Sequence, residues 1–130
     1  MQRRQLLLLA AAVTDSTFER TLLDGQTVWV GRCLHCRGKL VVRDDGRALG
    51  KASLEHVWPR TQGGTEDLEN LAVACAGCNR EKGVRHDCKG GQRLEEVVAL
   101  LRSRRRARWR DPRDVGMEAR LRSVRPTVAR

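Results

Sequence analysis

The chain has 130 residues, a formal net charge of +10 and 40% hydrophobic residues, which fits one small domain with an appended basic segment. It has one Phe, three Trp and no Tyr, so aromatic side chains add little to a core, and a structural metal would help it fold. No apolar stretch approaches the roughly twenty residues that a membrane span needs, so we expect no membrane contact.

The N-terminal residues 2–13 are rich in Leu and Ala and contain no helix breaker, which predicts a helix. It is apolar nearly all round, so we expect it to be buried against the rest of the chain or to contact a second copy or a partner protein. Its run Leu6–Val13 follows two arginines and also imitates a short signal peptide. Because zinc-binding thiolates persist better in a reducing compartment, we favour a packing helix in a cytoplasmic protein.

Two strands are predicted at residues 17–23 and 27–31, joined by Asp24-Gly25, a strong hairpin signal. The second strand leads into Cys33-x-x-Cys36, and Lys39–Arg43 follows as a third strand. This order is typical of a zinc-ribbon knuckle, in which a hairpin presents two thiolates from a tight bend.

A second Cys-x-x-Cys pair lies 38 residues further on, and the four sulfurs belong to Cys33, Cys36, Cys75 and Cys78. Two such pairs supply the four tetrahedral ligands of a structural Zn²⁺, and the cost of the long loop grows only logarithmically with its length. Disulfides or a redox Cys-x-x-Cys are the alternatives. Because the two pairs complete a tetrahedron, we assign no function to His35, His86 or Cys88.

Between and after the cysteine pairs the sequence predicts a ββα unit. Neighbouring residues on a strand point to opposite faces, so a bend or bulge near Pro59 would be needed to aim Glu55 and His56 at one site. The predicted parts are a strand at Ser53–Val57, a loop at Thr61–Thr65, a helical turn at Glu66–Asn70, a strand at Leu71–Ala74 and a helix at Gly77–Lys82 that ends at Gly83.

The stretch from Leu54 to Gly83 resembles the HNH endonuclease family. The matching residues are Glu55-His56-Val57, Pro59, Gly63-Gly64, Asn70-Leu71, Cys75, Cys78-Asn79 and Lys82-Gly83. Glu55 stands where Asp is commoner in that family. The resemblance implies an α+β fold with a small ββα-metal core and a four-cysteine, zinc-ribbon-like knuckle pair, flanked by the N-terminal helix and a basic C-terminal helix. We expect a nuclease domain at residues 1–90 and an Arg-rich helical extension at residues 91–130.

The resemblance also implies how the site works. His56 would be the general base that activates water, and Glu55 and Asn79 would be ligands of a catalytic Mg²⁺ (or Mn²⁺). Asn70 would hold the loop and the geometry of the site by hydrogen bonds.

The C-terminal part is strongly basic, since residues 102–130 carry 11 Arg against three acidic residues. We predict a helix at Gln92–Trp109, whose first half has an apolar stripe, and a weaker helix at Arg113–Val124. The charge suits a polyanion such as DNA, although solvated surface charge is the alternative. The nearest candidates for phosphate contacts are Arg60, Arg80 and Lys82.

Three hypotheses follow. The first is a metal-dependent HNH endonuclease that hydrolyses phosphodiester bonds in DNA. The second is a zinc-stabilised nucleic-acid-binding module without catalysis. The third is a subunit that grips nucleic acid with its basic tail and pairs with a homodimer mate or partner protein through its N-terminal helix.

Overall fold

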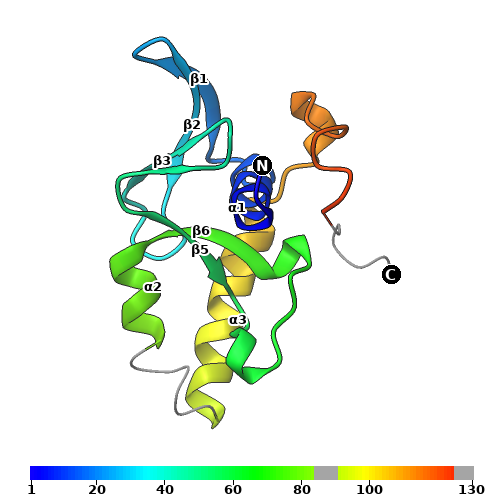
Figure 1. Cartoon of the computed structure of the whole chain (residues 1–130). Helices are drawn as coiled ribbons and strands as arrows, with labels where there is room; N and C mark the ends of the chain where they lie inside the picture. The colour runs from blue at the N-terminus through cyan, green and yellow to red at the C-terminus, as the bar shows by residue number, and fades with distance from the viewer. Residues whose placement is uncertain (84–90, 125–130) are drawn as a thin grey trace.

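The computed structural model describes residues 1–83 and 91–124, which form the predicted α+β fold (Figure 1). A four-stranded antiparallel sheet has the order β1-β2-β3-β4, and β5 pairs with β6 in a separate two-stranded sheet. In chain order the elements are α1 (Arg3–Val13), β1 (Glu19–Leu23), β2 (Gln26–Arg32), β3 (Lys39–Arg43), β4 (Ala48–Leu49), β5 (Ala52–His56), η1 (Arg60–Gln62), η2 (Leu68–Asn70), β6 (Leu71–Cys75), α2 (Ala76–Lys82), α3 (Gly91–Ala107) and η4 (Pro112–Val115).

The first hairpin forms where the sequence predicts it. Asp24 and Gly25 have φ values of 51° and 77°, the left-handed pair that a two-residue hairpin turn requires. Strand β1 is exposed along its whole length, whereas β2 buries Val28 and Trp29 in the core. The indole N–H of Trp29 donates to Asp44 Oδ1 at 2.9 Å, which secures the turn after β3.

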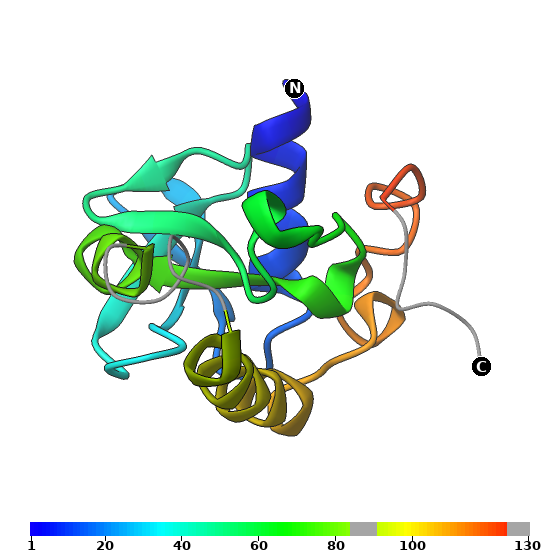
Figure 2. The same cartoon turned by 90° about the horizontal axis from the view of Figure 1, so that it is seen from below.

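The β5–β6 hairpin is the middle layer of the molecule (Figures 1 and 2). On one face Leu54, Leu71 and Val73 join the main core cluster together with α1. On the other face a second cluster joins the hairpin to α3 and consists of Leu34, Val57, Ala72, Leu94, Val98 and Leu101. The predicted helix at residues 92–109 is thus confirmed, and its apolar stripe packs on the β5–β6 hairpin.

Helix α1 is buried against the rest of the chain, which is one of the two arrangements expected for this apolar helix. Every residue from Leu7 to Val13 is buried, and together they form part of the main core cluster. The apolar surface that suggested a partner is therefore covered by the chain itself. No helix among the described residues has the length and hydropathy to cross a membrane.

One arginine of the basic segment is completely buried. Arg105 is 1% exposed, and its guanidinium donates to three backbone carbonyls and one hydroxyl. The acceptors are Leu71 O at 2.6 Å, Thr14 O at 2.9 Å, Thr14 Oγ1 at 2.6 Å and Leu68 O at 3.2 Å. Burial lowers the pKa of Arg105 to about 10, so it stays protonated at neutral pH. This side chain ties α3 to the end of α1, to η2 and to β6.

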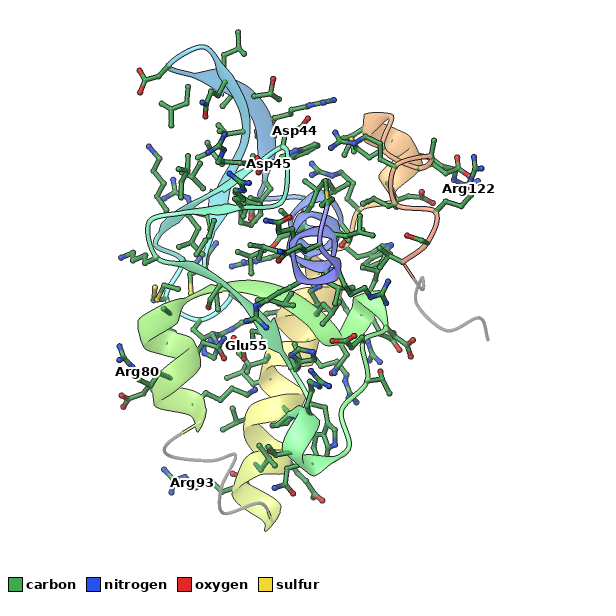
Figure 3. All side chains as sticks on the ribbon, viewed as in Figure 1. Asp44, Asp45, Glu55, Arg80, Arg93 and Arg122 are labelled. Carbon is green, nitrogen blue, oxygen red and sulfur yellow. The ribbon has the colours of Figure 1, made fainter. Side chains whose placement is uncertain are left out.

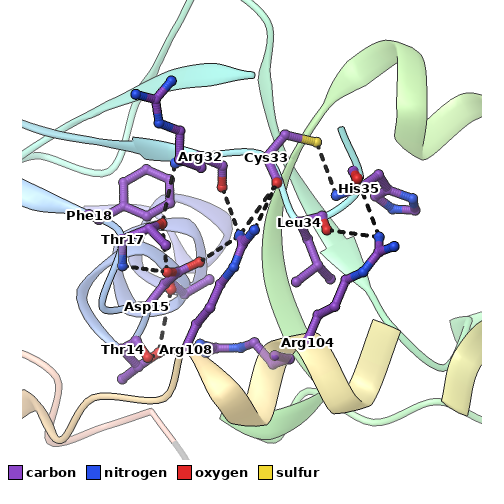
Figure 4. A network of polar contacts seen from close by, with 12 residues as sticks. Thr14, Asp15, Thr17, Phe18, Arg32, Cys33, Leu34, His35, Arg104 and Arg108 are labelled. Atoms are coloured by element: carbon purple, nitrogen blue, oxygen red, sulfur yellow. Dashed lines mark hydrogen bonds and ion pairs between the residues drawn. The ribbon is translucent and has the colours of Figure 1, made fainter. Parts of the chain in front are cut away.

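Three neighbouring arginines also point inward. Arg104 donates to the carbonyls of Leu34 and His35, both at 3.3 Å, and Arg108 donates to those of Arg32 and Cys33 (Figure 4). Arg110 donates to Val13 O at 2.9 Å and Phe18 O at 2.8 Å. These arginines satisfy backbone acceptors inside the fold. The interpretation of the basic segment as a phosphate-contacting tail is therefore corrected for these three side chains.

The predicted helix at Arg113–Val124 is wrong. Only the 3₁₀ turn η4 forms, because Gly116 at φ 70° ends it, and hydrogen-bonded turns continue to Val124. Arg120 secures this segment by donating to Asp44 Oδ2 at 2.9 Å and to Asp44 O at 2.6 Å.

Replacing Arg105 by Met should lower the free energy of unfolding by about 3–5 kcal/mol, because the buried acceptors lose their donors. Arg105→Lys should recover only part of this loss, since one ammonium cannot reproduce the guanidinium fork. Urea unfolding of each variant measures the effect. The control Arg106→Met removes an exposed arginine one position away and should change stability by less than about 0.5 kcal/mol.

Candidate active site

The four predicted zinc ligands come together at the junction of the two sheets. The sulfurs of Cys33, Cys36, Cys75 and Cys78 lie within 4.8 Å of one another. Backbone N–H groups donate to these sulfurs at 3.3–3.4 Å, and the donors are His35, Gly38, Cys75 and Cys78. Such N–H to sulfur contacts stabilise thiolates, so the cluster is built to hold a cation.

The chemistry of this cluster fits zinc. Burial and the neighbouring sulfurs raise the pKa of Cys78 far above its usual range, which makes four adjacent thiolates unfavourable without a metal. The four sulfurs lie close enough together to share one tetrahedral Zn²⁺. The alternative of disulfides is not met by these cysteines, because all four are free. With all four ligands from protein, such an ion has no open position and is structural.

Glu55 is completely buried on the α2 side of the hairpin (Figure 3). Its Oε1 is hydrogen-bonded to His35 Nε2, and its Oε2 lies 3.3 Å from Lys82 Nζ. Among the described residues Oε2 accepts no hydrogen bond, so the ion pair is its one polar contact. A buried carboxylate oxygen without a hydrogen bond is a suitable ligand for a hard divalent cation.

Glu55 and His56 do not share a face. The β5–β6 register continues without a bulge from Ala52↔Cys75 to His56↔Leu71, so successive side chains alternate. Glu55 faces α2 and α3, whereas His56 lies on the opposite face. The expected bend that would aim both side chains at one site is not met, because the chain turns at Pro59 only after the paired region ends.

Asn79 lies on the same face as Glu55, beside the start of β5. Its Nδ2 donates to Ser53 Oγ at 3.2 Å and to Leu54 O at 3.0 Å. Both amide hydrogens are therefore used, and Oδ1 is left as the atom that can meet a cation. Because Cys78 precedes Asn79 directly, the zinc knuckle sets the position of this amide.

Asn70 holds the loop that follows β5. Its Oδ1 accepts from Trp58 N at 2.7 Å, and its Nδ2 donates to Trp58 O at 3.1 Å and Thr65 O at 2.7 Å. The side chain therefore bridges the two ends of the loop at residues 58–65.

The Gly63-Gly64 pair is explained by the same loop. Gly63 has φ 90°, which side chains other than that of glycine rarely adopt. A Cβ at Gly64 would lie 1.7 Å from Trp58 O, so any side chain there would collide with the backbone.

His56 has an acidic neighbour and a lowered pKa. Its Nε2 lies 3.3 Å from Glu66 Oε2, and the imidazole is 13% exposed. Burial lowers the pKa of His56 below its ordinary value of 6.5, and Arg60 and Arg4 lower it further, while Glu66 opposes this shift. The ring is therefore neutral at pH 7 and able to accept a proton.

The three predicted phosphate-binding residues have different surroundings. Arg60 is exposed and lies 3.9 Å from Glu66, and Arg80 is exposed on the outer side of α2 (Figure 3). Lys82 is buried and donates to His56 O at 2.8 Å. A phosphate contact by Lys82 does not fit this geometry, because the carboxylate of Glu55 and the backbone hold its ammonium inside.

His35 is the site residue that the sequence analysis missed. The sequence analysis assigns it no function, but its imidazole contacts Glu55 across the space between the first knuckle and β5. The sequence around His35 does not indicate this contact, because the contact joins residues 20 positions apart. His86 and Cys88 lie outside the described residues.

Residues 33–85 match the family model described as HNH endonuclease. The matched segment begins at the first zinc-site cysteine and contains both knuckles, β5, β6 and α2. The match confirms the resemblance for this part of the chain. Neither the curated proteins nor the solved structures gave a significant match.

The zinc-binding role of the cysteines predicts one zinc ion per chain by elemental analysis. Cys75→Ser should lose the ion and most of the cooperative thermal transition, because zinc binding contributes on the order of 10 kcal/mol to such small domains. Cys88→Ser is the matched control and should keep both. Full zinc content in the Cys75 variant would refute the four-thiolate site.

The environment of His56 predicts an imidazole that titrates below pH 6.5, measured by NMR on zinc-loaded protein. Glu66→Gln should lower this pKa further, because the carboxylate favours the protonated ring. Arg60→Gln should raise it, because the guanidinium opposes protonation. Equal shifts of the same sign in both variants would show that the contacts of His56 differ from those described.

Proposed function

We propose that the chain is a metal-dependent endonuclease that hydrolyses phosphodiester bonds in DNA, with His56 as the general base. The observation that carries the proposal is the partly buried imidazole of His56, in contact with the carboxylate of Glu66, within the segment that matches the HNH endonuclease model. A histidine can accept a proton from water only while its ring is neutral. General-base catalysis is most effective when the pKa of the base lies near the working pH.

Glu66 supports this role by orienting the ring. When His56 Nε2 donates its hydrogen to Glu66 Oε2, the other ring nitrogen is the proton acceptor. The acceptor nitrogen removes a proton from the attacking water, and the carboxylate stabilises the imidazolium that forms. This is the base and orienting-group arrangement of many hydrolytic sites.

Glu55 and Asn79 would hold the divalent ion through Oε2 and Oδ1, the oxygens that have no hydrogen bond among the described residues. When bound, a divalent ion supplies electrostatic stabilisation of the phosphoryl oxygens. Glu55 must give up its ion pair with Lys82 to serve as a ligand, and Lys82 keeps its contact with His56 O. Arg60 and Arg80 are exposed and suit phosphate contacts.

A zinc-stabilised nucleic-acid-binding module without catalysis is the second candidate. The observation in its favour is that Glu55 is buried and already neutralised by Lys82, on the face opposite His56. In that case the knuckles and the exposed arginines would serve binding alone.

Plasmid cleavage by zinc-loaded protein separates the two candidates. The nuclease should cut only with added Mg²⁺ or Mn²⁺, and His56→Ala should reduce the rate by about 10²–10⁴-fold. The variant should keep its zinc and its affinity for plasmid. Binding without cleavage under every divalent ion would favour the binding module, and cleavage by His56→Ala at the wild-type rate would exclude His56 as the base.

A further inference from the structure

The buried carboxylate of Glu55 meets an imidazole that no part of the proposed mechanism uses. His35 Nε2 contacts Glu55 Oε1, and the His35 side chain is 18% exposed while that of Glu55 is fully buried. Asn79 lies on the same face of β5, with its amide fixed at Ser53 and Leu54. A carboxylate, an imidazole and an amide oxygen thus come from three separate segments of the chain to one side of the hairpin.

His35 is held in place from both ends of its backbone. Its N–H donates to Cys33 Sγ at 3.3 Å, and its carbonyl accepts from Arg104 Nη1 at 3.3 Å (Figure 4). The first zinc knuckle and helix α3 therefore fix the residue that carries the imidazole. Such preorganisation is expected of a ligand and is not needed for a surface histidine.

The contact also depends on the length of the acidic side chain. Glu55 occupies the position where an aspartate is commoner, and its extra methylene extends the carboxylate away from β5. The longer residue reaches His35, which projects from the first knuckle. The unusual acid and the histidine without an assigned function are thus parts of one contact.

Lys82 places a positive charge beside the carboxylate of Glu55. Its ammonium lies 3.3 Å from Glu55 Oε2, and both residues are buried. The fold therefore already accommodates one positive charge next to this oxygen. A divalent ion with an additional nitrogen ligand would compete with the ammonium better than one bound by two oxygens alone.

Resting on the proposed nuclease function, we propose that His35 is a third protein ligand of the catalytic divalent ion, beside Glu55 and Asn79. Imidazole nitrogen binds borderline transition-metal ions in preference to Mg²⁺, which takes oxygen ligands. The site therefore selects Mn²⁺ and related transition ions over Mg²⁺.

The test is Mn²⁺ binding to zinc-loaded protein, followed by electron paramagnetic resonance. A histidine ligand gives a nitrogen coupling in the electron spin echo, which should be present in the wild type and absent from His35→Gln. The glutamine amide can still donate to Glu55, so a merely positioning role would be rescued by this variant. A lost ligand should instead weaken Mn²⁺ binding by at least about tenfold and Mg²⁺ binding by less.

His56→Gln and His86→Gln are matched controls, because they remove the chain's other two histidines. Both should retain the nitrogen coupling, and zinc content and thermal stability should be unchanged in all three variants. Bound Mn²⁺ without a nitrogen coupling, together with plasmid cleavage, would overturn the His35 inference and leave the nuclease proposal standing. No Mn²⁺ binding and no cleavage would overturn both.

Discussion

The convergence of four cysteine sulfurs is the constraint on which the rest of this structure depends. The first pair lies in the connection between β2 and β3 and the second at the junction of β6 and α2, so one cysteine cluster joins the four-stranded sheet to the β5–β6 hairpin. The knuckles also determine where the chemistry lies. His35 sits inside the first and Asn79 follows the second directly, so the structural centre positions side chains on both sides of Glu55. A chain with few aromatic residues thereby obtains rigidity that its core alone would not supply.

The alternation of β5 divides the proposed active site between two layers. Glu55 is buried on the face that packs against α2 and α3, and Asn79 on α2 reaches back to β5. His56 faces the other way, at the last paired position of the hairpin, where Glu66 and the loop at residues 58–65 surround it. Asn70 fixes this loop from both ends, so the surroundings of His56 depend on these hydrogen bonds. A substrate phosphate would have to contact both layers at the open end of the hairpin.

Much of the fold could be predicted from the sequence, because its signals are local. Asp24-Gly25 specifies a two-residue turn, and paired cysteines at a spacing of three specify a knuckle whatever surrounds them. The contacts that sequence reasoning missed join distant segments. Nothing near Lys82 indicates that its ammonium would be buried against Glu55, and nothing near Arg105 indicates that backbone carbonyls would surround it. Every residue has a backbone carbonyl that can accept a hydrogen bond. An arginine that is buried against carbonyls therefore needs no acidic partner, and no acidic residue in the sequence indicates its position.

The inward arginines change what the composition means for a polyanionic partner. Counterion release depends on the number of phosphates that cationic side chains touch, rather than on the number of cationic residues in the chain. Four arginines donate hydrogen bonds to backbone carbonyls, namely Arg104, Arg105, Arg108 and Arg110. They satisfy acceptors that water would satisfy in an unfolded chain. The choice of 22 arginines against 4 lysines suits that use, because one guanidinium can serve several acceptors at once. Part of the positive charge that suggests a nucleic-acid partner thus serves to hydrogen-bond the backbone of the chain itself.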